Sequence, residues 1–164
     1  IYAGIMIDTN NFMTKTGVRT FEAAAFLRRC GADVTRVRKL FRENMNDYRA
    51  KGETISNAEI FLDCFAISEC PGDYVDSPTV IGSQAANELL NVIGVKASFV
   101  LTEYRGVIYV SARAIDEVNV QIIMERMGGG GHLNMAGCQL ETGMNEAKRI
   151  LKDTLTEMLE EGEI

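Results

Sequence analysis

The chain has 164 residues, of which 46% are hydrophobic and 24% charged, so it has enough apolar material to bury a core. Its net charge of −6 and the lack of a basic stripe argue against binding long nucleic acid by phosphate neutralisation, although a short nucleotide needs only a local positive field. The four cysteines form no CxxC pair and the chain has one histidine, so the usual zinc ligand sets are not met, and no apolar run is long enough to span a bilayer.

The first part of the chain is expected to hold one strand and then helices. Residues 1–7 form an apolar, β-compatible run, which we interpret as a buried strand that ends at Asp8. Because the chain begins without Met and inside this run, we expect it to be a piece of a longer protein. Thr20 is predicted to cap a helix that Gly31 closes, and Asp33 is predicted to cap the next helix.

The central part of the chain is expected to change from helix to sheet. Ser56 and Glu59 match a capping box, which predicts a helix running towards Cys64. A strand is predicted at 65–69, and both prolines lie in the polar stretch 71–79, which predicts a loop.

The next stretch predicts a helix followed by a β-hairpin. Apolar residues recur at helical spacing over 80–93, and Gly94 is predicted to end this helix. Two β-compatible runs, 97–103 and 107–113, are joined by a short turn at 104–106.

The last part of the chain is also mixed. Residues 119–127 are predicted to be helical, and four consecutive glycines, 128–131, follow directly. A last strand is predicted near Leu140, and Asn145 is predicted to cap an amphipathic C-terminal helix. The fold class expected from these elements is α/β.

The glycine run, together with His132, is the first candidate site. Four glycines lose much backbone entropy on folding, so they are expected where the backbone must reach a positive φ or approach something closely. Amides in such a loop can converge on an anion such as a phosphate. The run is not a P-loop, because no Gly-Lys-Ser/Thr follows it. A flexible turn beside an ordinary polar histidine is the other interpretation, and both remain open on these residues alone.

A second candidate lies in the strand 107–113. Side chains alternate across a sheet, so Ser111 and Arg113 share one face with Tyr109 while the other face is apolar. A guanidinium is suited to forked contacts with phosphate. The alternative is a surface strand with an ordinary exposed arginine.

Asp8 is a candidate metal ligand. A carboxylate at the end of an apolar strand suits a hard divalent cation, but the same residue could cap a turn. One carboxylate cannot hold a two-metal centre, and no other cluster of aspartates and histidines in the chain supplies the rest.

Five ordered motifs resemble the DHH/DHHA phosphoesterases, and the chain is most similar to the branch of membrane-anchored cyclic-di-AMP phosphodiesterases. The resemblance runs nearly from end to end. The motifs are Ala3-Gly4-Ile5-x-x-Asp8-Thr9-Asn10-Asn11-Phe12, Arg19-Thr20-Phe21-Glu22-Ala23-Ala24, Ser111-Ala112-Arg113, Asn119-Val120-Gln121-x-Ile123-Met124-Glu125 and Gly128-Gly129-Gly130-Gly131-His132-Leu133.

The resemblance implies a fold and a set of site residues. Residues 1–70 would be the last strand and helices of an incomplete DHH domain, with a connecting helix, and residues 71–164 a DHHA domain with a mixed sheet flanked by helices. By resemblance Asp8 matches a metal-ligand aspartate of the DHH domain. The residues that match the substrate-binding positions are Ser111, Arg113, Asn119, Gly129, Gly130, Gly131 and His132.

The resemblance also implies a cofactor and partners. Two Mn²⁺ ions would activate water for attack on a phosphodiester, with the DHHA side orienting the nucleotide. The expected partners are a cyclic or linear adenine dinucleotide, the missing DHH domain and a second copy in a homodimer. The expected location is a cytoplasmic domain of a membrane-anchored protein.

Two departures from the family pattern set the alternatives. The DxD and DHH motifs are missing, so we expect the chain itself to be inactive and to hold one orphan metal ligand. Residues 134–139 also differ from the usual pattern of the branch. The alternatives are a soluble relative that cleaves short oligoribonucleotides or 3′-phosphoadenosine phosphate, and a nucleotide-binding module without chemistry.

Overall fold

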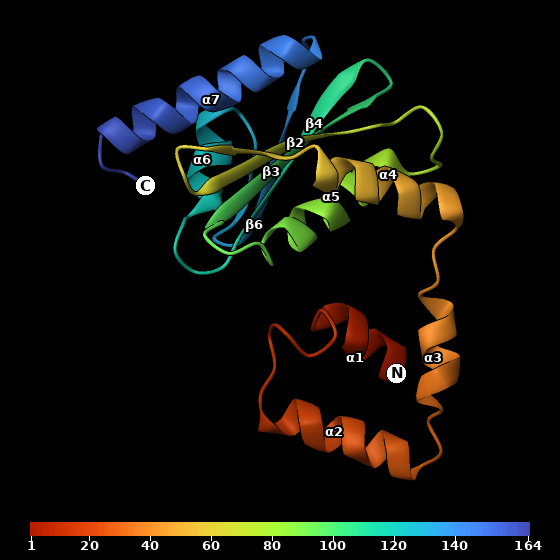
Figure 1. The fold of residues 1–164 in the computed structure, drawn as a ribbon. Coiled ribbons are helices and arrows are strands. Elements are labelled where there is room, and N and C mark those ends of the chain that lie inside the picture. Colours follow the sequence, from red (N-terminus) through yellow and green to blue (C-terminus); the bar gives the residue numbers. More distant parts are fainter. The chain divides into compact units, whose positions relative to one another are not determined.

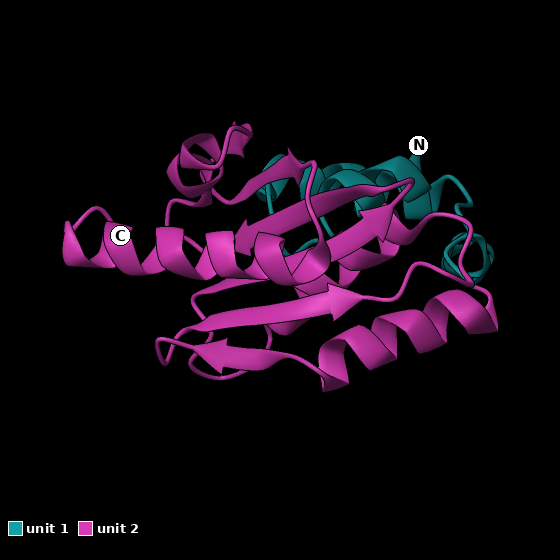
Figure 2. Ribbon diagram, turned by 90° about the horizontal axis from the view of Figure 1, so that it is seen from above, with its two compact units in different colours: residues 1–43 teal, residues 44–164 magenta.

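The computed structural model describes all of residues 1–164, which form two compact units. The first unit is Ile1–Glu43 and the second is Asn44–Ile164, coloured teal and magenta in Figure 2. None of their helices is both long and apolar enough to cross a lipid bilayer.

The first unit is helical, with α1 over Tyr2–Asp8, α2 over Val18–Arg29 and α3 over Val34–Leu40. The strand predicted at 1–7 is therefore wrong. No strand of this unit is present to pair with these residues, and a helix satisfies backbone donors and acceptors within the segment itself. Asp8 consequently ends a helix and not a strand.

Local capping explains the remaining boundaries of the first unit. The amide of Gly17 donates to the Thr20 hydroxyl at 3.3 Å, so α2 begins three residues earlier than predicted. The Asp33 cap is confirmed, because its carboxylate accepts hydrogen bonds from the amides of Thr35 at 2.9 Å and Arg36 at 3.2 Å.

The second unit is built on one six-stranded mixed sheet, in the order β1-β2-β3-β4-β6-β5. Only β2 and β3 run parallel, and the other neighbours are antiparallel. The hairpin predicted from 97 to 113 is confirmed as β3 and β4. The strands are β1 Glu59–Phe61, β2 Phe65–Cys70, β3 Ala97–Tyr104, β4 Val107–Ala114, β5 Gly130–His132 and β6 Met135–Leu140.

Four helices cover this sheet on both faces, as Figure 1 shows. On one face α6 (Val120–Arg126) and α7 (Met144–Glu160) bury the main core, which includes Phe65, Phe99, Ile108, Val110 and Leu155. On the other face α4 (Met45–Ser56) and α5 (Pro78–Leu89) pack in a smaller core with Ala66, Cys70 and Val100 of β2 and β3. No residue of β4, β5 or β6 belongs to that smaller core.

The helix predicted from Ser56 towards Cys64 is wrong. The Ser56 hydroxyl donates to the carbonyl of Glu53 and closes α4, and Glu59 enters β1 opposite Ile67. The strands β1 and β2 belong to the same sheet as β3, and the second compact unit begins at Asn44.

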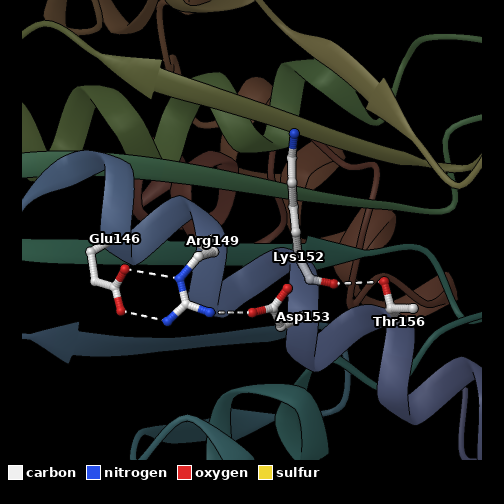
Figure 3. A network of polar contacts seen from close by, with 5 residues as sticks. All are labelled: Glu146, Arg149, Lys152, Asp153 and Thr156. Atoms are coloured by element: carbon white, nitrogen blue, oxygen red, sulfur yellow. Dashed lines mark hydrogen bonds and ion pairs between the residues drawn. The ribbon is translucent and has the colours of Figure 1, made fainter.

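The C-terminal helix α7 is amphipathic. Its buried side includes Ala147, Leu151, Leu155 and Met158, and its N-cap is Gly143, two residues before the predicted Asn145. On the exposed side Arg149 bridges Glu146 and Asp153 at 2.6 Å each (Figure 3). Such solvent-exposed ion pairs contribute little to stability, because water screens them. Burial of the apolar side therefore holds this helix on the sheet.

Candidate functional site

The part of the sheet that α4 and α5 leave open is organised by the pairing of β4 with β6. Arg113 lies opposite Met135, Ser111 opposite Gly137, and Tyr109 opposite Gln139. Directly opposed residues of an antiparallel pair point to the same face, so these six positions face the open side. The shared face predicted for Ser111 and Arg113 follows from this arrangement, because Val110 and Ala112 between them are buried in the main core.

The middle row of this face has almost no side chains. Ser111 is followed across the strands by Gly137 and then by Gly130 of β5. A groove of about 620 Å³ lies over this row. No acidic residue lines it, which favours an anionic ligand. The lining residues are Thr79, Tyr109, Val110, Ser111, Arg113, Gly128, Gly129, Gly130, Gly131, Met135, Ala136, Gly137, Cys138 and Gln139.

Arg113 is the charged group of the groove. It is 8% exposed, and it is held by hydrogen bonds from its guanidinium to the Ala112 carbonyl at 2.8 Å and to the Ser83 hydroxyl on α5. Its Nε is buried and has no partner, and no carboxylate pairs with it. Burial lowers the pKa of this guanidinium. A buried cation without a counter-charge is costly, and a bound anion would remove that cost.

The Ser111 hydroxyl lies one row away from Arg113 and has no hydrogen-bond partner within the chain. It is half-buried in the floor of the groove. A hydroxyl can donate to an oxygen of a bound anion there.

The first two glycines of the run serve the preceding helix. The amide of Gly128 donates to the Glu125 carbonyl at 3.0 Å, and the amide of Gly129 donates to the Met124 carbonyl at 2.7 Å. With φ +83° at Gly128, this is a Schellman motif that ends α6. These two amides are therefore committed to the helix end and cannot converge on an anion.

Two glycines of the run are needed for close packing of β5 on β6. A Cβ at Gly129 would lie 2.2 Å from the carbonyl oxygen of Gly137. A Cβ at Gly131, where φ is +152°, would lie 2.5 Å from that of Met135. Gly130 differs, because a Cβ there would meet no atom within 4 Å, and it lines the groove. The missing side chain of Gly130 leaves room for a ligand.

His132 lies at the edge of this site. It is opposite Met135, which is opposite Arg113, so the three residues form one row on the groove face. Two strand spacings separate the backbones of His132 and Arg113 by about 10 Å. The histidine is exposed and lies beside the groove, outside its lining residues.

Asn119 has a structural task. Its side-chain oxygen accepts a hydrogen bond from the Gln121 amide at 3.1 Å and caps α6. It does not line the groove. Its role here is to fix the start of the helix that leads into the glycine run.

Asp8 is exposed at the end of α1, in the first unit. No group of three or more His, Cys, Asp or Glu residues in the chain could hold a metal ion. The residues present therefore do not fit the two Mn²⁺ ions that the resemblance implies, because a two-metal centre needs several ligands around both ions.

Sequence reasoning missed two groove residues, Gln139 and Thr79, and the partner of Arg113, which is Ser83. Ser83 is 30 positions from Arg113 and reaches it only because α5 packs beside β4. Gln139 joins the groove through the pairing of β6 with β4. Alternation along β6 could have placed Gln139 on one face with Gly137, but not opposite Tyr109.

Comparison with known proteins finds relatives in sequence and in fold. The chain is 41% identical over 164 residues to the cyclic-di-AMP phosphodiesterase GdpP of Geobacillus thermodenitrificans, covering 99% of this chain and 25% of that protein. It is 42% identical over 142 residues to the cyclic-di-AMP phosphodiesterase PdeA of Listeria monocytogenes, covering 86% of this chain and 22% of that protein. The chain thus spans about a quarter of the length of these relatives.

The fold is also similar to solved structures. An exopolyphosphatase-related protein from Bacteroides fragilis superposes with a TM-score of 0.84 at 22% identity, over 94% of this chain and 48% of that one. This confirms the mixed α/β fold. The model of the DHHA1 domain matches residues 72–161, which include the groove strands β4 and β6 and the glycine run. The chain belongs to the DHHA1 domain family.

Proposed function

We propose that this chain is the substrate-binding part of a phosphodiesterase that hydrolyses cyclic-di-AMP to a linear dinucleotide. The observation that carries the proposal is the buried, unpaired guanidinium of Arg113 beside a groove floor that lacks side chains. The names of the relatives, which are 41–42% identical, support the reaction class and the substrate.

In this proposal the residues of the chain bind and orient the dinucleotide, and they do not activate the water that attacks it. Arg113 would donate to the oxygens of the phosphate that is attacked and offset the negative charge that grows on it. Ser111 would donate a further hydrogen bond, and the open position at Gly130 would let the sugar–phosphate backbone approach the sheet. His132 would contact the ligand from the edge of the groove.

The chain on its own would hydrolyse nothing. A Mn²⁺ centre in the intact protein would supply the activated water, and its ligands would lie mainly outside these residues. Asp8 would join that set only in the intact protein. We further propose that the intact protein is membrane-anchored, holds this part on the cytoplasmic side, and forms a homodimer.

Binding is tested by calorimetric titration of the chain with cyclic-di-AMP and with the linear dinucleotide pApA. Arg113→Ala should weaken binding at least tenfold, because charge-assisted hydrogen bonds contribute about 1.5–3 kcal/mol each. Arg149→Ala is the matched control, since it removes the same charge from the exposed side of α7. Equal affinities of the Arg113→Ala variant and the wild type would contradict the proposal.

The reaction is tested separately, by product chromatography. The intact protein with Mn²⁺ should convert cyclic-di-AMP to pApA, and the chain alone with Mn²⁺ should not. Turnover by the chain alone would contradict the proposed division of labour. Preferential cleavage of short linear oligoribonucleotides or 3′-phosphoadenosine phosphate by the intact protein would favour the soluble-relative alternative.

A further inference from the structure

The groove has two chemically different ends. Arg113 lies at one end, and the opposed pair of Tyr109 and Gln139 lies at the other. Tyr109 and Arg113 are four positions apart on an extended strand, which is about 13 Å along β4. We propose that Tyr109 and Gln139 form a subsite that binds an adenine base. This inference rests on the proposed function only in placing the phosphate of the ligand at Arg113.

The ring of Tyr109 is held in place before any ligand binds. It packs against the ring of Tyr104, with centroids 6.4 Å apart and planes tilted by 57°. The guanidinium of Arg105 lies 5.0 Å from the centre of the Tyr104 ring. A fixed aromatic ring that is half-buried in a groove is a platform on which a base can stack.

The amide of Gln139 is available to a ligand. Its side chain is exposed at the groove and makes no hydrogen bond within the chain. A glutamine amide presents one acceptor and one donor, which match N6 and N7 of adenine. A purine with a carbonyl at position 6, such as hypoxanthine, offers no donor there and would lose the contact to the amide oxygen.

The row between the two ends leaves space for the rest of a nucleotide. Ser111 and Gly137 separate the row of Arg113 from the row of Tyr109, and neither has a large side chain. A nucleotide lying along β4 would therefore place its phosphate at Arg113, its sugar over the glycine row and its base against Tyr109.

The test is an NMR chemical-shift titration of the chain with AMP, with inosine 5′-monophosphate and with inorganic phosphate. The wild type should prefer AMP over inosine monophosphate by about tenfold, as a two-bond amide contact to a base provides. Gln139→Ala should remove this preference and leave inorganic phosphate binding unchanged. Gln121→Ala removes a glutamine amide from α6, outside the groove, and should keep the preference.

The ring is tested by two substitutions at one position. Tyr109→Ala should weaken both nucleotides about tenfold, since stacking accounts for an energy of that order, whereas Tyr109→Phe keeps the ring and should retain most of the affinity. Thermal melting of each variant checks that the fold is kept.

The outcomes separate this inference from the proposed function. Any of three results overturns the base subsite. The wild type shows no preference for AMP, the preference survives in Gln139→Ala, or Tyr109→Phe weakens binding as much as Tyr109→Ala. If phosphate binding still depends on Arg113 in those cases, the proposed function stands. No binding of nucleotide or phosphate by the wild type overturns both.

Discussion

Arg113→Met is the substitution that best separates a ligand-binding role from a structural one. Methionine has a similar length and an apolar side chain, so it fills the space of the guanidinium stem without a charge. In the wild type Arg113 is 8% exposed as a residue, and its guanidinium lacks any acidic partner. If Arg113 is present for an anion, its removal should cost binding and should not cost stability.

The expected size of the stability change follows from two opposing contributions. Removing an uncompensated buried charge removes a desolvation penalty of several kcal/mol. Two hydrogen bonds are lost at the same time, to the Ala112 carbonyl and the Ser83 hydroxyl, and each contributes about 1.5–3 kcal/mol when one partner is charged. The two contributions nearly cancel, so the free energy of unfolding should be unchanged or higher by up to about 2 kcal/mol.

Ligand affinity, unlike the free energy of unfolding, should be lowered by Arg113→Met. The charge-assisted hydrogen bonds to a phosphate disappear, which should weaken cyclic-di-AMP about 10- to 100-fold. Ligand at 100 times the wild-type dissociation constant should therefore stabilise the wild type by about 2.7 kcal/mol and the variant by only about 0.4–1.4 kcal/mol.

Urea unfolding followed by circular dichroism, with and without ligand, measures both quantities on the same samples. A loss of more than about 2 kcal/mol in the Arg113→Met variant would refute the reasoning. It would show that the hydrogen bonds of the guanidinium hold α5 against β4, and that the arginine is a structural residue. Unchanged ligand affinity would refute the binding role directly.

Three further substitution tests follow from the contacts of the groove. Ser83→Ala should lower the affinity for pApA several-fold in calorimetry, because the Arg113 guanidinium loses the hydroxyl that orients it. Ser83→Thr keeps a hydroxyl and should retain the affinity. Equal losses of affinity in the two variants would argue against orientation by the hydroxyl. Gly130→Ala should change the free energy of unfolding by less than about 1 kcal/mol and still lower the affinity for the ligand. Gly131→Ala places a side chain at φ +152° and against backbone atoms, so it should lower the free energy of unfolding in urea titration by about 1–3 kcal/mol. Burial raises the pKa of the Cys138 thiol to about 11. The pKa of this thiol is thus higher in the folded state than in the unfolded state, so between about pH 9 and pH 11 the unfolded state releases the proton first. The free energy of unfolding should therefore fall as the pH rises from about 9 to about 11. Urea titrations across this pH range should show a smaller fall in the free energy of unfolding for Cys138→Ala than for the wild type. Identical pH dependence in the two proteins would contradict the raised pKa of Cys138.

The fold was predictable where the pattern of the sequence is local. Alternation over 107–113 predicted a strand with Ser111 and Arg113 on one face, and the structure has that strand as β4. The apolar run at 1–7 misled the prediction, because a short apolar segment is compatible with either strand or helix and the presence of a pairing strand decides between them. The capping box at Ser56 failed for a related reason, since the same serine can close a helix through a neighbouring carbonyl.

The site was predictable only in part, because its composition depends on pairing across the sheet. Arg113 was found from the sequence, but its missing counter-charge and its contact with Ser83 follow from the packing of α5 beside β4. Tyr109 and Gln139 come together because β6 pairs with β4 in one particular register. Strand register is set by long-range contacts, and a shift of one residue would turn Gln139 to the other face.

The glycine run illustrates how one motif can combine local and long-range constraints. Gly128 and Gly129 close α6 through their amides, and Gly129 and Gly131 allow β5 to lie against β6. Substitutions at these three positions therefore damage the fold, and a loss of binding in such variants says nothing about contact with a ligand. At Gly130 the space above the backbone is free, so only this position separates access to the groove from folding. In the proposed function the motif would therefore contribute to ligand binding mainly through the missing side chain at Gly130, and the positive charge for a phosphate would come from Arg113 on a different strand.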